Sequence, residues 1–224
     1  MVAQPRQHLG RPRDADLAAK RREEILDAAI PIFARFGFRN TEVQLVADKL
    51  GVGKGTIYRY FPSKRELFLK AVDHGIRRMH ERVESSVPPH AELYERMEHS
   101  IRAYLTFFDE HPEVVELLMQ ERAEFKDRKQ QTYFEHSDRN KLRWRAACDK
   151  NIANGRLRDL PFDQGSDFIQ YLIYGTMFTN YFRGLHKSIA QQTREILDIL
   201  WFGILSDKER ARMLPQVQVQ EPRP

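Results

Sequence analysis

The chain has a single cysteine, Cys148, among its 224 residues. One thiol cannot form an internal disulfide, and it has no thiol companion for a zinc site. The sequence also lacks a leading apolar segment of the secretory type. We therefore expect the protein to work in the reducing cytoplasm, and not as a disulfide-stapled secreted domain.

Long apolar runs and strand-like alternation are missing as well. Gln170, Asn180 and Arg183 interrupt the stretch 168–185, which argues against a membrane span. No segment alternates apolar and polar residues for long enough to suggest a sheet, whereas apolar residues recur at helical spacing throughout, so the predicted fold class is all-α with about nine helices. In the second half we expect helices over residues 91–110, 112–126, 130–154, 163–184 and 189–206.

The residue spacings of common catalytic and metal sites are absent too. The eight histidines are scattered, and no glutamate stands three positions before a histidine, as a di-iron helical bundle requires. His99, His111 and His136 each follow a glutamate directly, which puts each pair on different helix faces. We expect no metal, no cofactor and no enzymatic activity; an α-helical enzyme is the less favoured alternative.

The positive charge is concentrated at one end of the chain. The formal net charge is +5, yet residues 1–70 contain 14 basic and eight acidic side chains, a net charge of +6. The other 154 residues carry a net charge of −1. This asymmetry favours a polyanionic partner for the N-terminal part.

Residues 41–67 combine two short helical patterns around a glycine turn, in the sequence TEVQLVADKLGVGKGTIYRYFPSKREL. Thr41 and Gln44 have the spacing of a capping box, which predicts that a helix begins there. Gly51 is expected to end this helix, because glycine adopts the left-handed conformation with the least strain.

A second helix is predicted between Gly53 and Pro62. Ile57 and Phe61 are four residues apart and are expected to face inward. Ser63 with Glu66 repeats the capping-box spacing and predicts a third helix immediately afterwards. The side chains left outside on the second helix are Lys54, Thr56, Tyr58 and Arg59.

Residues 51–56 superficially resemble a phosphate-binding loop. That motif requires a glycine five positions before its Gly-Lys pair and a serine or threonine directly after it. Asp48 and Gly55 occupy those positions here, so a nucleotide-binding loop is excluded.

Two short helices joined by a glycine turn form the helix-turn-helix pattern, whose second helix enters the major groove of DNA. Residues 51–64, GVGKGTIYRYFPSK, closely resemble the signature of the TetR family of bacterial transcriptional regulators, and residues 41–47 resemble the helix before it. The resemblance covers about the first third of the chain. It implies a three-helix DNA-binding domain followed by a helical ligand-binding and dimerisation domain, in a homodimeric repressor released from its operator by a small molecule.

The resemblance and the outward spacing together assign the DNA contacts. Lysine and arginine reach guanine and phosphate, threonine reaches base edges, and tyrosine hydroxyls bind phosphate. A two-fold symmetric dimer implies a palindromic double-stranded operator. For Gln44 and Tyr60 a purely structural role is equally open. The predicted DNA-binding residues are Thr41, Gln44, Gly53, Lys54, Gly55, Thr56, Tyr58, Arg59, Tyr60 and Lys64.

Four regions are expected along the chain. Residues 1–19 lack apolar periodicity and predict a flexible basic arm, in which Arg11 and Arg13 are the useful charges. The predicted DNA-binding domain follows over 20–70, with a supporting helix that starts at Lys20, contains Pro31 and ends at Gly37. Residues 71–210 form the predicted effector and dimerisation domain, and 211–224 a disordered tail.

The last two helices are apolar on more than one side, so each is expected to be buried on two sides. Pairing with a second copy supplies that burial, and in the family these two helices form a four-helix bundle between subunits. The predicted dimer residues are Phe168, Leu172, Gly175, Phe182, Ile196, Leu200, Trp201 and Ile204.

An apolar effector chamber with hydroxyl groups is expected between the long helix after Ser63 and the dimer helices. Pocket and core share a composition, and such residues more often belong to the core, so about one in four of those assigned is expected to touch a ligand. The predicted effector-binding residues are Tyr104, Phe107, Phe108, Met119, Trp144, Tyr171, Tyr174 and Phe178. A DNA-binding architectural protein without ligand control is the alternative, and it predicts no cavity in the second domain.

Overall fold

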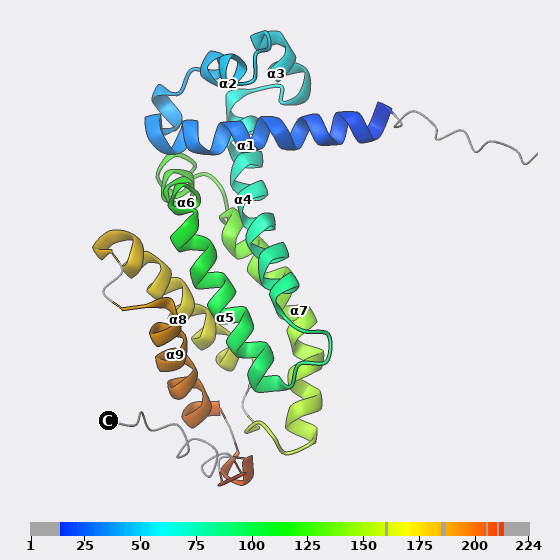
Figure 1. The fold of residues 1–224 in the computed structure, drawn as a ribbon, viewed down its shortest axis with the longest axis vertical. Coiled ribbons are helices and arrows are strands. Elements are labelled where there is room, and N and C mark those ends of the chain that lie inside the picture. The colour runs from blue at the N-terminus through cyan, green and yellow to red at the C-terminus, as the bar shows by residue number, and fades with distance from the viewer. Residues whose placement is uncertain (1–13, 160, 185–186, 205, 210, 213–224) are drawn as a thin grey trace, which may run out of the picture. The chain divides into compact units, whose positions relative to one another are not determined.

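The computed structural model describes residues 14–159, 161–184, 187–204, 206–209 and 211–212. Within these residues the chain contains helices and no strand, which confirms the all-α fold class. The chain divides into two compact units, Met1–His74 and Gly75–Pro224. The helices of Figure 1 are α1 (Asp14–Asn40), α2 (Val43–Lys49), α3 (Lys54–Tyr60), α4 (Lys64–Ser86), α5 (Leu93–Glu110), α6 (Pro112–Glu124), α7 (Thr132–Ala153), α8 (Phe162–Arg183) and α9 (Ile189–Ile204).

The helices α5 to α9 begin and end within two residues of the predicted bounds. Proline and glycine set these limits. Pro112 occupies the first position of α6, where its missing N–H costs no hydrogen bond. Gly155 and Gly184 follow α7 and α8 with φ angles of 66° and 74°, the left-handed conformation that ends a helix.

The first helix begins earlier than predicted. It starts at Asp14, so residues 14–19 belong to α1 and not to the arm, whose remaining residues lie outside the described part of the chain. Alanine and leucine favour a helix in these residues. Leu17 is 49% exposed, so this first part of α1 has no buried apolar face of the kind that the sequence pattern reveals. Gly37 has the non-helical angles φ 77° and ψ 160° inside α1. Pro31 is exposed within the helix, and the structure gives no role for it.

The capping box predicted at Thr41 is wrong. The Thr41 hydroxyl donates to the carbonyl oxygen of Gly37 at 2.7 Å, and Gln44 instead donates to Asp48 at 2.7 Å. The N-cap of α2 is Glu42, which makes no side-chain cap hydrogen bond. The cap predicted at Ser63 is present, because its hydroxyl accepts the backbone N–H of Glu66 at 3.1 Å.

The core of the first unit is aromatic. Phe33 of α1 and Phe68 of α4 meet edge to face with their ring centroids 5.1 Å apart. Ile57 of α3 is fully buried, and Phe61 directly after α3 is 1% exposed. The inward orientation predicted for these last two residues is confirmed, and it fixes the opposite face of α3 towards solvent.

In the second unit α5 is the central helix, since α6, α8 and α9 all pack against it. Leu105 of α5, Leu117 of α6, Met177 of α8 and Leu200 of α9 are all at most 2% exposed. Glu121 is buried as well, and it accepts hydrogen bonds from the backbone N–H and the hydroxyl of Thr132 at 3.0 and 2.8 Å. This carboxylate thereby ties α6 to the start of α7.

Candidate functional site

The turn between α2 and α3 is set by its glycines. Gly51 has a φ of 65°, and the next N–H, that of Val52, donates to the carbonyl of Ala47 at 3.0 Å. Gly53 is the N-cap of α3 and accepts the N–H of Thr56 at 2.8 Å. The two helices pack on each other through buried apolar residues, so α3 presents one face outward.

The outward face of α3 is basic and aromatic. Tyr58 is 38% exposed, and the Lys54 ammonium lies 6.0 Å from the centre of its ring. The Arg59 guanidinium lies 5.3 Å from the ring centre of Tyr60. The sequence of α3 contains no acidic residue, and a Cβ added at Gly55 would meet nothing within 4 Å. A short helix with this surface suits phosphate binding and contacts to base edges.

Two cationic side chains donate hydrogen bonds to backbone carbonyls at the boundaries of the helix-turn-helix. Sequence reasoning assigned this structural role to neither of them. Arg22 of α1 donates to the carbonyl of Tyr60 at 3.1 Å. Lys64 donates to the carbonyls of Arg39 and Thr41 at 2.9 and 3.1 Å. These partners are 23 or more residues apart in sequence, so no local pattern signals them.

The assignment of Thr41 to the DNA backbone is corrected here. Thr41 is 1% exposed, and both its hydroxyl and its N–H are bonded to the carbonyl of Gly37. Its side chain therefore does not reach the surface. Gln44 is exposed on α2, so its side chain can reach DNA. In the protein alone its amide donates a hydrogen bond to Asp48.

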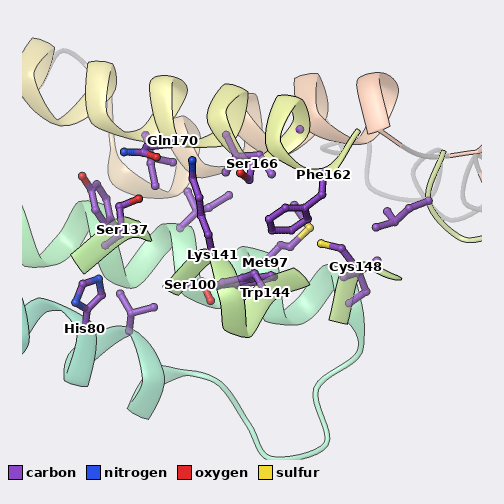
Figure 2. A pocket seen from close by; sticks show the side chains of 18 of the residues that line it. His80, Met97, Ser100, Ser137, Lys141, Trp144, Cys148, Phe162, Ser166 and Gln170 are labelled. Atoms are coloured by element: carbon purple, nitrogen blue, oxygen red, sulfur yellow. The ribbon is translucent and has the colours of Figure 1, made fainter. Parts of the chain in front are cut away.

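The second unit encloses a cavity of about 270 Å³. Its walls come from α4, α5, α7, α8 and the connection between α7 and α8, and Figure 2 shows its side chains. Most of the lining is apolar, with polar groups at separate positions. The lining residues are Met79, His80, Val83, Leu93, Met97, Ser100, Ile101, Tyr104, Tyr133, Ser137, Lys141, Trp144, Cys148, Ile152, Leu157, Arg158, Pro161, Phe162, Gly165, Ser166, Ile169, Gln170 and Ile173.

Two of the eight predicted effector residues, Tyr104 and Trp144, line this cavity. Phe107 and Phe108 lie one turn beyond Tyr104 on α5, outside the lining, and are 3% and 5% exposed in the core. Tyr171 points outward from α8 with 66% exposure. Met119, Tyr174 and Phe178 are also outside the lining. The prediction therefore identified α5, α7 and α8 as walls of the chamber, but it included α6, which lines none of it, and most of the residues it chose are outside the lining.

A buried tyrosine pair closes part of the wall. The hydroxyls of Tyr104 and Tyr133 lie 2.9 Å apart, and Tyr104 also donates to the sulfur of Met177 at 3.5 Å. Burial raises the pKa of both phenols, so they remain neutral hydroxyls. Burial likewise raises the pKa of the Cys148 thiol, which disfavours the reactive thiolate.

An apolar face is exposed on the last two helices. Phe168 and Phe182 of α8 are 50% and 66% exposed, and Ile199 and Phe202 of α9 are 52% and 55% exposed. Gly175 lies on the exposed side of α8 with open space around it, and Leu172 is half-buried.

Two predicted dimer residues are instead part of the protomer's own core. Ile196 and Leu200 are 6% and 0% exposed on the side of α9 that packs on α5. Trp201 is half-buried and meets the Tyr94 ring edge to face at 5.4 Å. Ile204 ends α9, and its side chain is outside the described part of the structure.

The described residues form neither a metal site nor a membrane span. They contain no group of three or more His, Cys, Asp or Glu side chains arranged to hold a metal ion. None of the helices that the structure describes is long and apolar enough to cross a membrane.

These features define a helix-turn-helix DNA-binding protein with a second, helical unit that contains a cavity. Residues 25–71 match the family described as bacterial regulatory proteins, tetR family. The uncharacterized HTH-type transcriptional regulator YhgD of Bacillus subtilis is 28% identical over 143 residues, which cover 63% of this chain and 74% of that protein. The HTH-type transcriptional repressor KstR2 of Mycobacterium tuberculosis is 29% identical over 154 residues, which cover 67% of this chain and 76% of that one.

The solved structure of the ketosteroid transcriptional regulator KstR2 of Mycobacterium tuberculosis superimposes with a TM-score of 0.57 at 25% identity. The match covers 84% of this chain and 96% of that chain. Residues 25–71 thus form the DNA-binding domain of the tetR family, and the chain is a DNA-binding transcriptional regulator.

Proposed function

We propose that this regulator is a cytoplasmic homodimeric repressor, released from a palindromic operator when an effector occupies the cavity of its second unit. The first unit binds DNA through α3, and the second binds the effector and the partner subunit. The cavity carries this proposal, because a ligand-independent architectural protein has no need of one. The name of the similar KstR2, a transcriptional repressor, supports the negative sign of regulation.

The exposed face of α8 and α9 supports the homodimer. Isolated apolar side chains are common on protein surfaces, but Phe168, Phe182, Ile199 and Phe202 are large and gather on two helices that pack together. A second copy of the same face would cover them in an isologous interface. The two recognition helices are then related by a two-fold axis, which requires an operator of inverted half-sites.

Helix α4 supports the coupling between effector and DNA. Met79, His80 and Val83 near its end line the cavity, and its first residue, Lys64, follows α3 after a three-residue connection. A ligand that shifts α4 is expected to change the spacing of the two recognition helices. Effector and operator then weaken each other's binding by the same factor, typically about 5 to 150-fold.

The proposal is tested by selecting bound sequences from a random double-stranded DNA library with the full-length chain. We expect inverted repeats with half-sites about one helical turn, roughly 34 to 36 Å, apart or a multiple of it. The operator complex is then titrated with small molecules, and any active compound is titrated against the protein with and without DNA. A compound that binds the second unit and leaves operator affinity unchanged would contradict the coupling.

A further inference from the structure

The cavity has a polar end and an apolar end. Along α7 its lining runs from Ser137 through Lys141 and Trp144 to Cys148, a path of roughly 16 Å at the rise of an α-helix. The ion pairs of Lys141 with Asp167 and of Arg145 with Asp163 show that α8 runs in the opposite direction beside α7. In Figure 2, Ser137 and Gln170 lie together at one end, and Trp144, Cys148 and Phe162 lie towards the other.

The lysine at the centre of the lining is already paired within the protein. Lys141 forms a hydrogen-bonded ion pair with Asp167, and a second carboxylate, that of Asp138, is 4.0 Å away. Arg158 donates to the carbonyl of Gly203 in the last turn of α9 at 2.7 Å. An anionic group beside Ser137 and Gln170, one helical turn from Lys141, would therefore have to displace a carboxylate from that lysine.

No aspartate or glutamate lines the cavity among the described residues, so a cationic ligand finds no counter-charge there. The polar groups that remain available are neutral. Within the described part of the chain, Ser100, Ser137 and Gln170 line the cavity without a hydrogen-bond partner in the protein. A charged group that enters such a site loses its hydration and gains no partner in exchange, so its binding is unfavourable.

We infer that the effector of the proposed function is an uncharged, mainly apolar molecule that carries a hydroxyl or carbonyl oxygen at one end. Its oxygen lies between Ser137 and Gln170, where a hydroxyl and an amide offer both donors and acceptors. Its apolar body extends towards Trp144, Met97 and Phe162. This inference rests on the effector site of the proposed function and specifies its chemistry.

The cavity sets a minimum size for this molecule. Its volume of about 270 Å³ leaves room for a chain ligand of at least roughly ten non-hydrogen atoms. Nonanol and nonanone have this size, and nonanoate and octyltrimethylammonium are matched analogues with a negative and a positive charge.

The test measures the affinity of the full-length dimer or monomer for these four compounds by titration calorimetry without DNA. It is done at a mildly alkaline pH, where imidazole charge is suppressed. We expect nonanol and nonanone to bind. The two ions should bind with an affinity that is lower by a factor of roughly ten or more. Binding should change the fluorescence of Trp144, one of two tryptophans in the chain, and Trp144→Phe should remove that change.

Two pairs of variants on α8 test the roles of named groups. Gln170→Leu should weaken nonanol binding about fivefold by removing a hydrogen bond, whereas Gln164→Leu, at an exposed position outside the lining, should not. Asp167→Asn releases Lys141 and should strengthen nonanoate binding. Asp163→Asn, whose carboxylate is paired with Arg145, should leave nonanoate binding weak.

Each outcome decides the inference. It is overturned if nonanoate or octyltrimethylammonium binds the wild type as tightly as nonanol, if neither neutral compound binds, or if Asp167→Asn leaves nonanoate binding unchanged. Operator release is measured separately. If nonanol binds with the expected pattern but operator affinity stays constant, the ligand chemistry stands and the coupling in the proposed function fails.

Discussion

The ammonium of Lys64 donates to the carbonyl oxygen of Arg39 at 2.9 Å and so closes the end of α1. It also donates to the Thr41 carbonyl and lies 5.0 Å from the ring centre of Phe38. Sequence reasoning placed this lysine on the DNA backbone. Its observed partners make it a structural element of the first unit, whatever it contributes to phosphate binding.

Lys64→Met is therefore expected to lower the free energy of unfolding by about 1 kcal/mol, because two carbonyls lose a charged donor at a partly exposed site. Urea unfolding measures this change. Lys70→Met, an exposed lysine on the same helix, is the control for the lost charge. Equal stability of the two variants would refute the structural role.

Lys54 is expected to determine base choice. It stands at the start of α3, one turn before the exposed Tyr58, and its ammonium lies 6.0 Å from the centre of that ring. Lys54→Ala should cost about 1 to 3 kcal/mol of operator affinity and relax selectivity at one base position. Fluorescence anisotropy with the selected operator and its single-base variants measures both effects.

Lys70→Ala removes the same charge away from α3 and should leave the ranking of base variants unchanged. If the folded double variant Lys54→Ala/Tyr58→Ala bound the operator as tightly as the wild type, α3 would not be the recognition helix that contacts the bases.

Local chemistry explains what the sequence could predict. Pro112, Gly155 and Gly184 interrupt the helical pattern by fixed backbone preferences, so the helix bounds were readable. Ile57 and Phe61 are one helical turn apart, so their shared inward direction followed from period alone.

The sequence did not predict which hydrogen-bond acceptor a side chain uses or which apolar face of a helix is buried. The carbonyl of Gly37 competes for the hydroxyl of Thr41, and this acceptor is invisible to a rule based on residue spacing. Helix α9 is apolar on two sides, so its pattern did not distinguish Leu200, in the protomer core, from Phe202, on the exposed face. The cavity was misplaced for a similar reason, because pocket and core residues have the same composition.

Glu121 is expected to make stability depend on pH. Burial raises its pKa above the ordinary value of 4.5, and the hydrogen bonds from Thr132 oppose that shift. Between 4.5 and the raised pKa the folded state binds more protons than the unfolded state, so the free energy of unfolding falls as pH rises through this interval. Glu121→Gln removes the titration.

The measurement is urea unfolding at a series of pH values from 4.5 upward. The stability of the wild type relative to Glu121→Gln should decrease as the pH rises, while Glu81→Gln, at an exposed position, should track the wild type. A relative stability that is flat or increases with pH would contradict the assigned direction.

The dimer face is tested by two substitutions two residues apart on α9. Phe202 is 55% exposed in the protomer, whereas Leu200 is fully buried. Phe202→Glu should yield folded monomers, since it places a charge in the proposed interface and leaves the protomer core intact. Leu200→Glu should unfold the second unit, because it buries a charge without a partner.

Light scattering gives the mass of each variant, and circular dichroism gives its helix content and melting temperature. Operator affinity of Phe202→Glu should fall sharply, because each half-site is then bound by an independent protomer. A wild-type protein that is monomeric at micromolar concentration would show that there is no dimer. A Phe202→Glu variant that stays dimeric with full operator affinity would show that the subunit contact is elsewhere. The contrast with Leu200→Glu separates loss of association from loss of folding, which a substitution on the buried side of α9 alone does not.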